Sequence, residues 1–385
     1  MKKRILLIEH TSSEFIISRL KLGTFLMEQG HEVYALVPAG KEADLAHIRQ
    51  AGLRLIPYPY ERNTTSLGAN LQLVRFFIRV FREHRFDLIH SFKFQPNLYA
   101  VLARLFSPPS FLVLHITGLG LVFTKERSLK LRLFQLVSKL IFLFNFVFAS
   151  RIIFQNPDDE ADLWLTSWFG RKLTVIEGSG VDIEKFDRRR FDHQAIKQSL
   201  SLSPDRFILT FISRLVWQKG IREVVQAVEE LGPAHPALQL LVVGDSDKNN
   251  PQAVSDTYIA GYTDHPNIRF LGRRSDIPEI LAITDLYVYP SYYREGLPRT
   301  VLEALATGVP IITTDMPGCN LTVEQGKNGY LIGIEDVEAI KAAILRIYQS
   351  GQAKAMGCES RRLVETKFQN KIVYQKIYRV YQELL

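Results

Sequence analysis

Residues 286–308 read LYVYPSYYREGLPRTVLEALATG, and this stretch decides the fold. Its first four residues, 286–289, are apolar and rich in β-formers, which predicts a buried strand. Pro298 favours a helix start, and Gly308 suits the left-handed position just after a helix. A buried strand followed by a loop and a helix is the repeating unit of a parallel α/β sheet.

Two carboxylates flank the start of this helix. Glu295 lies in the loop after the strand, and Glu303 lies about one turn inside the helix. Thr300, Glu303 and Thr307 are three and four residues apart, so they share the face opposite the apolar one. Because ligands of open α/β sheets bind at the carboxyl ends of strands, both carboxylates are candidate ligand contacts. Spacing alone equally allows a loop charge at Glu295 and a solvated helix residue at Glu303.

Short apolar runs alternate with helical segments along the chain, which predicts two α/β domains with parallel sheets. In the first half we expect strands at 4–8, 32–37, 53–57, 86–90, 112–115, 152–155 and 173–177. In the second half we expect them at 207–212, 238–243, 268–271, 286–289, 309–313 and, more weakly, 330–332. We place the hinge after Gly180, which gives domains 1–180 and 181–367 and a last helix, 368–385.

Composition narrows the class of protein. The 385 residues are 46% hydrophobic and 23% charged, as in folded soluble proteins. Two cysteines, Cys319 and Cys358, make no disulfide framework and fit a reducing compartment. The N-terminal bases precede an apolar run too short for a signal peptide, so we expect a cytoplasmic protein. The net charge of +8 predicts an acidic partner, and no zinc spacing or RNP motif favours nucleic acid.

Residues 125–149 have a composition of their own. Five bases and one acid are interleaved with Leu, Phe, Val and Ile, and the apolar run LIFLFNFVFA follows at 140–149. That run is too short to span a membrane, but a basic amphipathic helix can lie in an anionic membrane interface. A buried helix is the alternative, and both hold if the first half faces the surface and the second half joins the core.

The turn SRLVWQKG follows strand 207–212 and brings Arg214 and Lys219 to the start of the next helix. A helix N-terminus favours anions, because its free N–H groups and its dipole both point at them. Arg214 can grip two oxygens at once and Lys219 acts as a point charge, so the pair suits a diphosphate. Ordinary surface cations are the alternative.

These motifs together carry a family resemblance over nearly the whole chain. FQNPDD, GSGVD, SRLVWQKG, GRRSDIPE and REGLPRTVLEA occur here in the order seen in family 4 retaining glycosyltransferases of GT-B fold. The resemblance extends to the bacterial enzymes that lengthen undecaprenyl-diphosphate-linked sugars, of the diacetylbacillosaminyl-diphospho-undecaprenol α-1,3-N-acetylgalactosaminyltransferase type. It implies an α/β fold of two Rossmann-like domains facing across a cleft, with the last helix crossing back to the N-terminal domain.

The resemblance also implies roles on the donor side. The first Glu of the motif, Glu295, would contact the donor sugar and Glu303 the nucleotide ribose, while Arg214 and Lys219 would hold the diphosphate. The remaining donor-binding candidates are Gly272, Arg273, Gly296, Leu297 and Thr300. One departure is visible, because Tyr292-Tyr293 holds one residue more than the usual loop.

Candidates in the N-terminal domain come from strand ends and from the resemblance. Some family members place a His or Thr near the reacting carbon, which makes His115 and Thr117 paired catalytic candidates. His90 has the same standing at the preceding strand end, and a structural histidine is the alternative. An acceptor diphosphate needs cations, for which Arg19 and Arg62 are candidates beside His90, with surface arginines as the alternative.

The sequence therefore predicts a retaining transferase that moves a sugar, an N-acetylhexosamine, from a UDP-sugar to a polyprenyl-diphosphate-linked saccharide at the inner face of the membrane. No cofactor and no metal are expected, and Asp245-Ser246-Asp247 is interpreted as turn chemistry. Three rivals remain: a transferase of the same fold with a soluble acceptor, a nucleotide-sugar epimerase of GT-B fold, and a non-catalytic polyanion binder.

Overall fold

The computed structural model describes residues 2–59, 67–120, 129–163, 166–248 and 250–385. The chain divides into two compact units, residues 1–180 with 370–385, and residues 181–369. The second unit starts where the sequence places the hinge, and the last helix begins at Asn370 rather than at 368. Every expected strand is present, with ends shifted by at most two residues.

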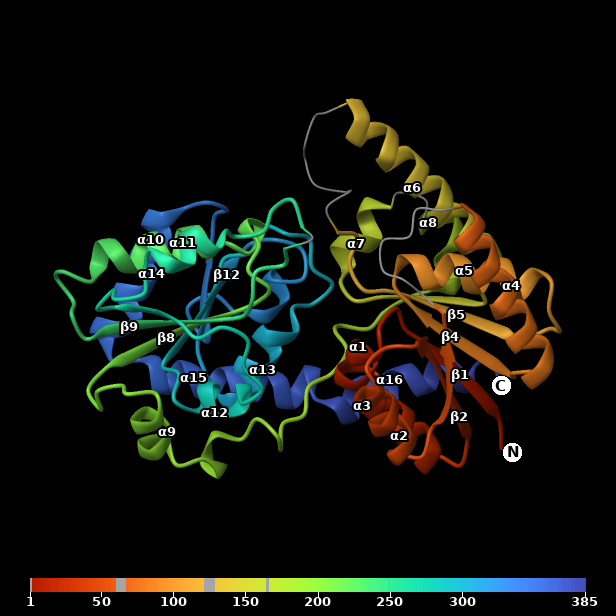
Figure 1. Ribbon diagram of the computed structural model, residues 1–385, viewed down its shortest axis with the longest axis horizontal. Coiled ribbons are helices and arrows are strands. Elements are labelled where there is room, and N and C mark those ends of the chain that lie inside the picture. Colours follow the sequence, from red (N-terminus) through yellow and green to blue (C-terminus); the bar gives the residue numbers. More distant parts are fainter. Residues whose placement is uncertain (1, 60–66, 121–128, 164–165, 249) are drawn as a thin grey trace. The chain divides into compact units, whose positions relative to one another are not determined.

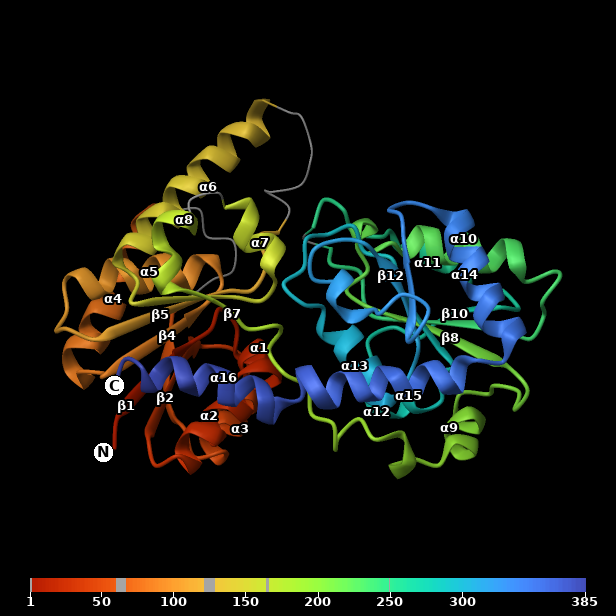
Figure 2. The same ribbon diagram turned by 180° about the vertical axis from the view of Figure 1, so that it is seen from behind.

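The first unit is a parallel sheet wrapped by helices (Figures 1 and 2). Its strands are β1 (Arg4–Ile8), β2 (Glu32–Pro38), β3 (Arg54–Tyr58), β4 (Leu88–Phe92), β5 (Phe111–Ile116), β6 (Arg151–Phe154) and β7 (Leu173–Val175). Its helices are α1 (Ser12–Ser18), α2 (Leu20–Glu28), α3 (Glu42–Gln50), α4 (Leu67–His84), α5 (Phe94–Leu105), α6 (Leu129–Phe148), α7 (Pro157–Asp162), α8 (Thr166–Phe169) and α16 (Asn370–Gln382). The strand order is β3-β2-β1-β4-β5-β6-β7.

Both faces of this sheet are buried, as alternation along a parallel strand requires. Leu6 and Ile8 of β1 point into a core formed with α4, α5 and α6. Ile5 and Leu7 point into a second core, formed with α1, α2, α3 and α16. The C-terminal helix α16 is therefore an integral part of the first unit.

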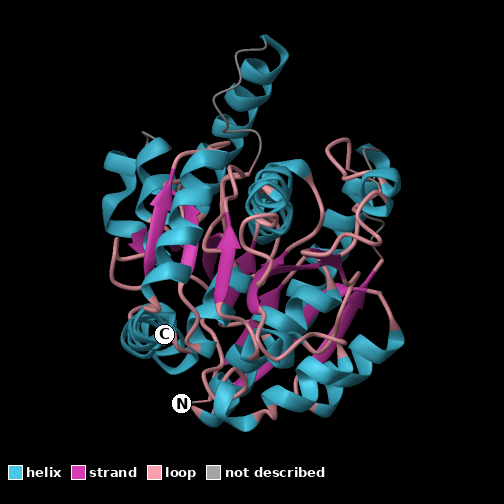
Figure 3. Cartoon of the chain, turned by 90° about the vertical axis from the view of Figure 1, so that its left-hand side faces the viewer, coloured by secondary structure: helices cyan, strands magenta, loops and turns pink. Residues whose placement is uncertain are grey.

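The second unit repeats the architecture, with helices and loops surrounding the strands (Figure 3). Its strands are β8 (Phe207–Ile212), β9 (Leu238–Val243), β10 (Ile268–Phe270), β11 (Leu286–Tyr289), β12 (Ile311–Thr314) and β13 (Gly329–Ile332), in the order β10-β9-β8-β11-β12-β13. Its helices are α9 (His193–Ser199), α10 (Ile221–Leu231), α11 (Asp256–Ala260), α12 (Ile277–Ala282), α13 (Arg299–Thr307), α14 (Val337–Ser350) and α15 (Ala353–Leu363), followed by one π turn, Val364–Phe368.

The helix that follows β11 begins and ends as its sequence predicts. Pro298 is the N-cap of α13, and Gly308 closes it in the left-handed conformation with φ 79°. The polar face of this helix is not solvated, because Glu303 and Thr307 are buried along with the apolar face. The interpretation of Glu303 as a solvated helix residue is therefore wrong.

Helix α6 changes character along its length. Phe142 and Phe146 in its second half are buried in the core of the first unit. Its first half extends past the neighbouring helices of that unit (Figure 1), and there Leu133 and Phe134 are 63% and 54% exposed. The helix thus combines a surface half with a core half. Among the described helices, none has the length and apolarity needed to span a bilayer.

Candidate functional site

Each sheet has one switch point, where the chain leaves one half of the sheet and starts the other. In the second unit this point lies between the adjacent strands β8 and β11. Arg214 and Lys219 follow β8, and Glu295 follows β11. Open α/β sheets bind ligands at the carboxyl ends of such strands, so the topology gathers three of the sequence candidates at one edge.

Lys219 and Glu295 form an ion pair at this edge. The Lys219 side chain is buried, and its Nζ also lies 4.5 Å from the ring centroid of Tyr293. Glu295 Oε1 accepts a second hydrogen bond, at 2.9 Å, from the hydroxyl of Tyr289. Tyr289 was not a sequence candidate, because a tyrosine inside a buried strand is indistinguishable from core. A low-exposure ion pair with a tyrosine donor is a ready partner for sugar hydroxyls and phosphate oxygens.

The loop that carries Glu295 is tied to the turn that carries Lys219. The backbone N–H groups of Tyr292 and Tyr293 donate to Gln218 O at 3.0 and 3.2 Å. Gly220 has φ +80°, and a Cβ there would lie 2.3 Å from Pro290 O. Only glycine fits that close approach, so the sequence KG after the turn fixes the distance between the two loops.

Glu303 is held inside the unit by its own helix. Arg299 Nε donates to Glu303 Oε1 at 3.0 Å, and the Thr307 hydroxyl donates to Glu303 O at 2.9 Å. Burial raises the pKa of the Glu303 carboxyl, and the Arg299 charge opposes that rise. The spacing of Arg299 and Glu303, i to i+4, was the signal in the sequence that could have found this pair. Thr300 lies on the same helix and is half-buried, and Gly296 and Leu297 are buried.

Arg214 is exposed and pairs with Asp247, with Arg214 Nη1 2.8 Å from Asp247 Oδ2. The neighbouring Asp245 accepts a hydrogen bond from the backbone N–H of Arg273 at 2.9 Å. Gly272, directly before Arg273, has a φ of +63°. Both aspartates of the D-x-D pattern thus accept from protein donors, and among the described residues no three or more His, Cys, Asp or Glu side chains gather as a metal site.

The candidates of the first unit lie at its own switch point, between β1 and β4. Arg19 is buried, with its Nε 3.2 Å from Glu9 Oε2 and its guanidinium 3.8 Å from the ring centroid of Phe92. The interpretation of Arg19 as a surface arginine is therefore wrong. Thr117 follows β5 and is half-buried. Arg62 lies outside the described residues.

His90 and His115 are both completely buried and contact each other. His115 Nδ1 lies 3.2 Å from His90 Nε2, and the other nitrogen of His90, Nδ1, contacts the Tyr381 hydroxyl of α16. Burial lowers the pKa of both imidazoles well below the usual value. The structure therefore joins two of the sequence candidates into one buried cluster.

Sequence reasoning missed the residues beside Arg19. Glu9 is buried at the end of β1, and its Oε1 lies 2.7 Å from His10 Nδ1 and 3.9 Å from Lys93 Nζ. Lys93 has φ +73°, a left-handed conformation that is rare outside glycine. The acid directly after a strand was the available signal, but its partners are far away in sequence.

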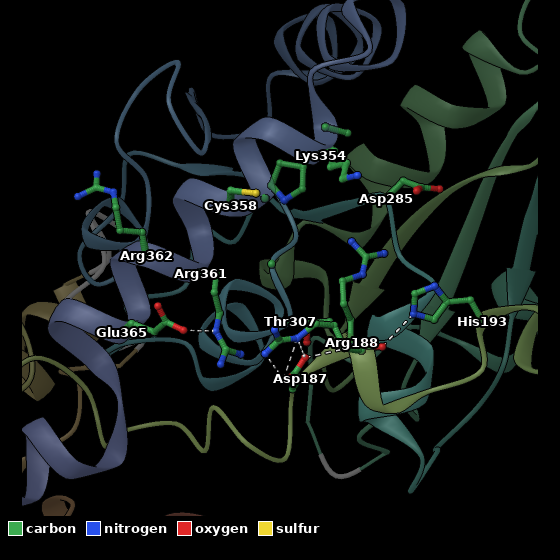
Figure 4. Close-up of a pocket in the computed structure, with 15 residues that line it drawn as sticks. Asp187, Arg188, His193, Asp285, Thr307, Lys354, Cys358, Arg361, Arg362 and Glu365 are labelled. Atoms are coloured by element: carbon green, nitrogen blue, oxygen red, sulfur yellow. Dashed lines mark hydrogen bonds and ion pairs between the residues drawn. The ribbon is translucent and has the colours of Figure 1, made fainter.

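A cavity of about 750 Å³ also opens in the second unit, at the amino ends of β11 and β12 (Figure 4). Asp285, Thr307 and Cys358 line it with several arginines. Arg361 is occupied there, since it donates to Ile183 O and Ala306 O and pairs with Glu365. This cavity is at the opposite edge of the sheet from Lys219 and Glu295.

Comparison with known proteins identifies a domain in each half of the chain. Residues 20–165 match the "Glycosyl transferase 4-like domain" model, and residues 192–362 match the "Glycosyl transferases group 1" model. The chain is therefore a glycosyltransferase that carries these two domains. Each model falls within one of the two structural units.

Two relatives of this glycosyltransferase are named by their reactions. It is 24% identical, over 99% of both chains, to the N,N'-diacetylbacillosaminyl-diphospho-undecaprenol α-1,3-N-acetylgalactosaminyltransferase of Campylobacter jejuni. It is 28% identical to the UDP-Gal:α-D-GlcNAc-diphosphoundecaprenol α-1,3-galactosyltransferase of Escherichia coli, over 70% of this chain and 68% of that one. The crystal structure of Anabaena HepE in complex with UDP covers all of both chains with a TM-score of 0.81 at 20% identity. The fold of this glycosyltransferase is GT-B, as its motifs imply.

Proposed function

We propose that this glycosyltransferase moves a sugar, an N-acetylhexosamine, from a UDP-sugar to a polyprenyl-diphosphate-linked saccharide with retention of configuration. The observation that carries the proposal is the Lys219–Glu295 ion pair at the β8–β11 switch point. The names of both relatives, each a transferase onto a diphospho-undecaprenol-linked sugar, support the acceptor class. The UDP complex of HepE supports the donor class.

In the donor site, Lys219 and Arg214 would hold the diphosphate, and Glu295 would accept hydrogen bonds from sugar hydroxyls. Glu303 would bind the ribose hydroxyls. Gly272, Arg273, Gly296, Leu297 and Thr300 would complete the contacts to the donor. Cations beside a departing diphosphate stabilise the charge that develops on it, which would let the reaction proceed without a metal. Retention would follow a same-face path, in which the leaving phosphate takes the proton of the attacking acceptor hydroxyl.

In the acceptor site, Arg19 and His90 would line the first unit, with His115 and Thr117 next to the reacting carbon. Arg62 keeps its proposed role as an acceptor contact. The exposed apolar residues on the first half of α6, with Arg132 and Lys139 beside them, would rest on an anionic membrane. The enzyme would thus work in the cytoplasm, peripherally at the inner face of the membrane where its acceptor is anchored.

The deciding experiment measures UDP release from a panel of UDP-sugars, with and without a short polyprenyl-diphosphate-linked saccharide, in EDTA. We expect release only with the lipid-linked acceptor, and undiminished by EDTA. Equal release with a soluble saccharide would favour the soluble-acceptor rival, and release without any acceptor would favour an epimerase.

Two variants test the donor site within that assay. Glu295→Gln and Lys219→Met each remove one charge of the buried pair, and we expect either to lower the rate by about 100-fold or more, as for loss of a charged transition-state contact. Glu338→Gln and Lys341→Met act on an ion pair at the surface of the same unit, which Lys341 also extends to Glu230, and are the matched controls. Equal losses in test and control variants would contradict the assignment of the donor site.

A further inference from the structure

Three buried side chains of the first unit form a hydrogen-bonded chain that leads from α16 to the end of β5. His115 lies on β5, His90 on β4 and Tyr381 on α16, and none is exposed. His115 Nδ1 is 3.2 Å from His90 Nε2, and His90 Nδ1 contacts the Tyr381 hydroxyl. The two imidazole planes are 13° apart, and their ring centroids are 5.3 Å apart.

All three side chains are neutral at pH 7. Burial lowers the pKa of both histidines, and the nearby charge of Arg19 lowers it further. Burial raises the pKa of Tyr381 well above its usual value. Each imidazole therefore carries one proton, and one of its nitrogens donates while the other accepts.

Only two proton arrangements make both hydrogen bonds of this chain. In the first, the Tyr381 hydroxyl donates to His90 Nδ1, and His90 Nε2–H donates to His115 Nδ1, so that His115 carries its proton on Nε2. In the second, every bond runs the other way, and His115 Nε2 is a bare acceptor. The second arrangement also leaves the Tyr381 hydroxyl proton without an acceptor, because no other acceptor contacts Tyr381 among the residues that the structure describes. The first arrangement leaves fewer buried groups unpaired and is favoured.

The last atom of this hydrogen-bonded series, His115 Nε2, is buried and has no hydrogen-bond partner within the described residues. The backbone of His115 is held in place, since the N–H of Lys93 and the side-chain amide of Asn97 both donate to His115 O, at 3.1 and 3.2 Å. An unpaired polar atom at the carboxyl end of a parallel strand indicates a place that a ligand oxygen completes.

We infer that Tyr381, acting through His90, holds His115 in the Nε2–H tautomer, so that His115 donates a hydrogen bond to an oxygen of the bound sugar or phosphate. Tyr381 and His90 are positioning residues, because they act through His115. Since both ring nitrogens of His90 are engaged, the part of His90 in the acceptor site is indirect. In this state His115 is no proton acceptor, which agrees with a reaction in which the leaving phosphate takes the proton. The identity of the ligand rests on the proposed function, whereas the tautomer does not.

The tautomer is measured directly by ¹⁵N NMR of the full-length protein labelled at histidine. We expect His90 and His115 to be neutral at pH 7, each with a protonated Nε2 and a bare Nδ1. A proton on His115 Nδ1, or on both of its nitrogens, would overturn the inference. This measurement needs neither a variant nor activity, so it stands even where the proposed function fails.

The positioning role is tested by Tyr381→Phe, which removes one hydroxyl from the same buried ring. The matched control is Tyr378→Phe on the same helix, where the Tyr378 hydroxyl lies 3.0 Å from His31 Nε2. We expect Tyr381→Phe to populate both tautomers of His115 and to lower kcat about tenfold, the size of one lost hydrogen bond, with the KM for the UDP-sugar little changed. Tyr378→Phe should change neither. An unchanged His115 spectrum and rate in Tyr381→Phe would overturn the role of Tyr381.

Discussion

Glu9 is a completely buried carboxylate whose charge is kept by its neighbours. Burial alone would raise the pKa of Glu9, but Lys93, the hydrogen bond from His10, and Arg19 together lower it to about 2. A carboxyl whose pKa is lowered in the native state stabilises the fold at any pH above its unfolded-state pKa. It loses that contribution as the pH falls toward the native pKa. Glu9 therefore stabilises the first unit at neutral pH.

Glu9→Gln should lower the free energy of unfolding of the first unit by about 3 kcal/mol at pH 7. The difference from the wild type should shrink as pH falls from about 4.5 toward 2, because protonation makes the native carboxyl resemble the amide. Urea unfolding followed at several pH values measures both effects. Glu42→Gln breaks an exposed pair with Arg49 and should cost less than about 1 kcal/mol; a pH-independent loss in Glu9→Gln would contradict the account.

Single residues also show where sequence reasoning stops. Glu295 and Lys219 were found because each follows a strand in a family motif, and their strands are neighbours in the sheet. For Arg19 the sequence left a surface arginine open as the alternative, because its burial depends on Glu9 and on Phe92 of another strand. The contact between His90 and Tyr381 joins positions 291 residues apart. No local pattern contains such a pair.

At the scale of elements, local rules predict well where a single element settles the outcome. Strand β11 and the left-handed Gly308 after α13 follow from apolar runs, proline and glycine alone. Periodicity placed Thr300, Glu303 and Thr307 on one face of α13, but it cannot show whether a second layer covers that face. Packing between elements, rather than propensity, buries Glu303 and Thr307.

Helix α6 yields a prediction about membranes. Leu133→Ser with Phe134→Ser should lower binding to vesicles of phosphatidylglycerol and phosphatidylcholine by at least about tenfold, since each apolar side chain contributes about 1.5–3 kcal/mol when buried. Cosedimentation measures the bound fraction. Leu71→Ser with Phe106→Ser removes one leucine and one phenylalanine of the same unit that are 52% and 60% exposed, and should bind as the wild type does. Equal binding by both double variants would show that α6 does not anchor the protein.

At the scale of the whole molecule, the chain makes separate cores in its two units. One core lies entirely within 181–369, and the other two lie within 1–180 and 370–385. The returning helix α16 supplies Val373, Ile377 and Tyr381 to the first unit. Periodicity predicted that helix, but only the family resemblance implied which unit it joins, because an amphipathic face does not specify its partner.

Separate cores predict that the donor nucleotide stabilises the units unequally. UDP at 100 times its Kd should raise the free energy of opening of the second unit by about 2.7 kcal/mol, and so slow hydrogen exchange in peptides from 181–369. Exchange in the sheet of residues 4–116 should stay nearly unchanged. Mass spectrometry of the exchanging protein resolves the two units. Lys219→Met should abolish the protection because it removes a cation from the diphosphate site, whereas Lys341→Met should keep it. Equal protection of both units by UDP would mean that the first unit holds the nucleotide as firmly as the second, and the donor site would then have to be rebuilt from residues of both.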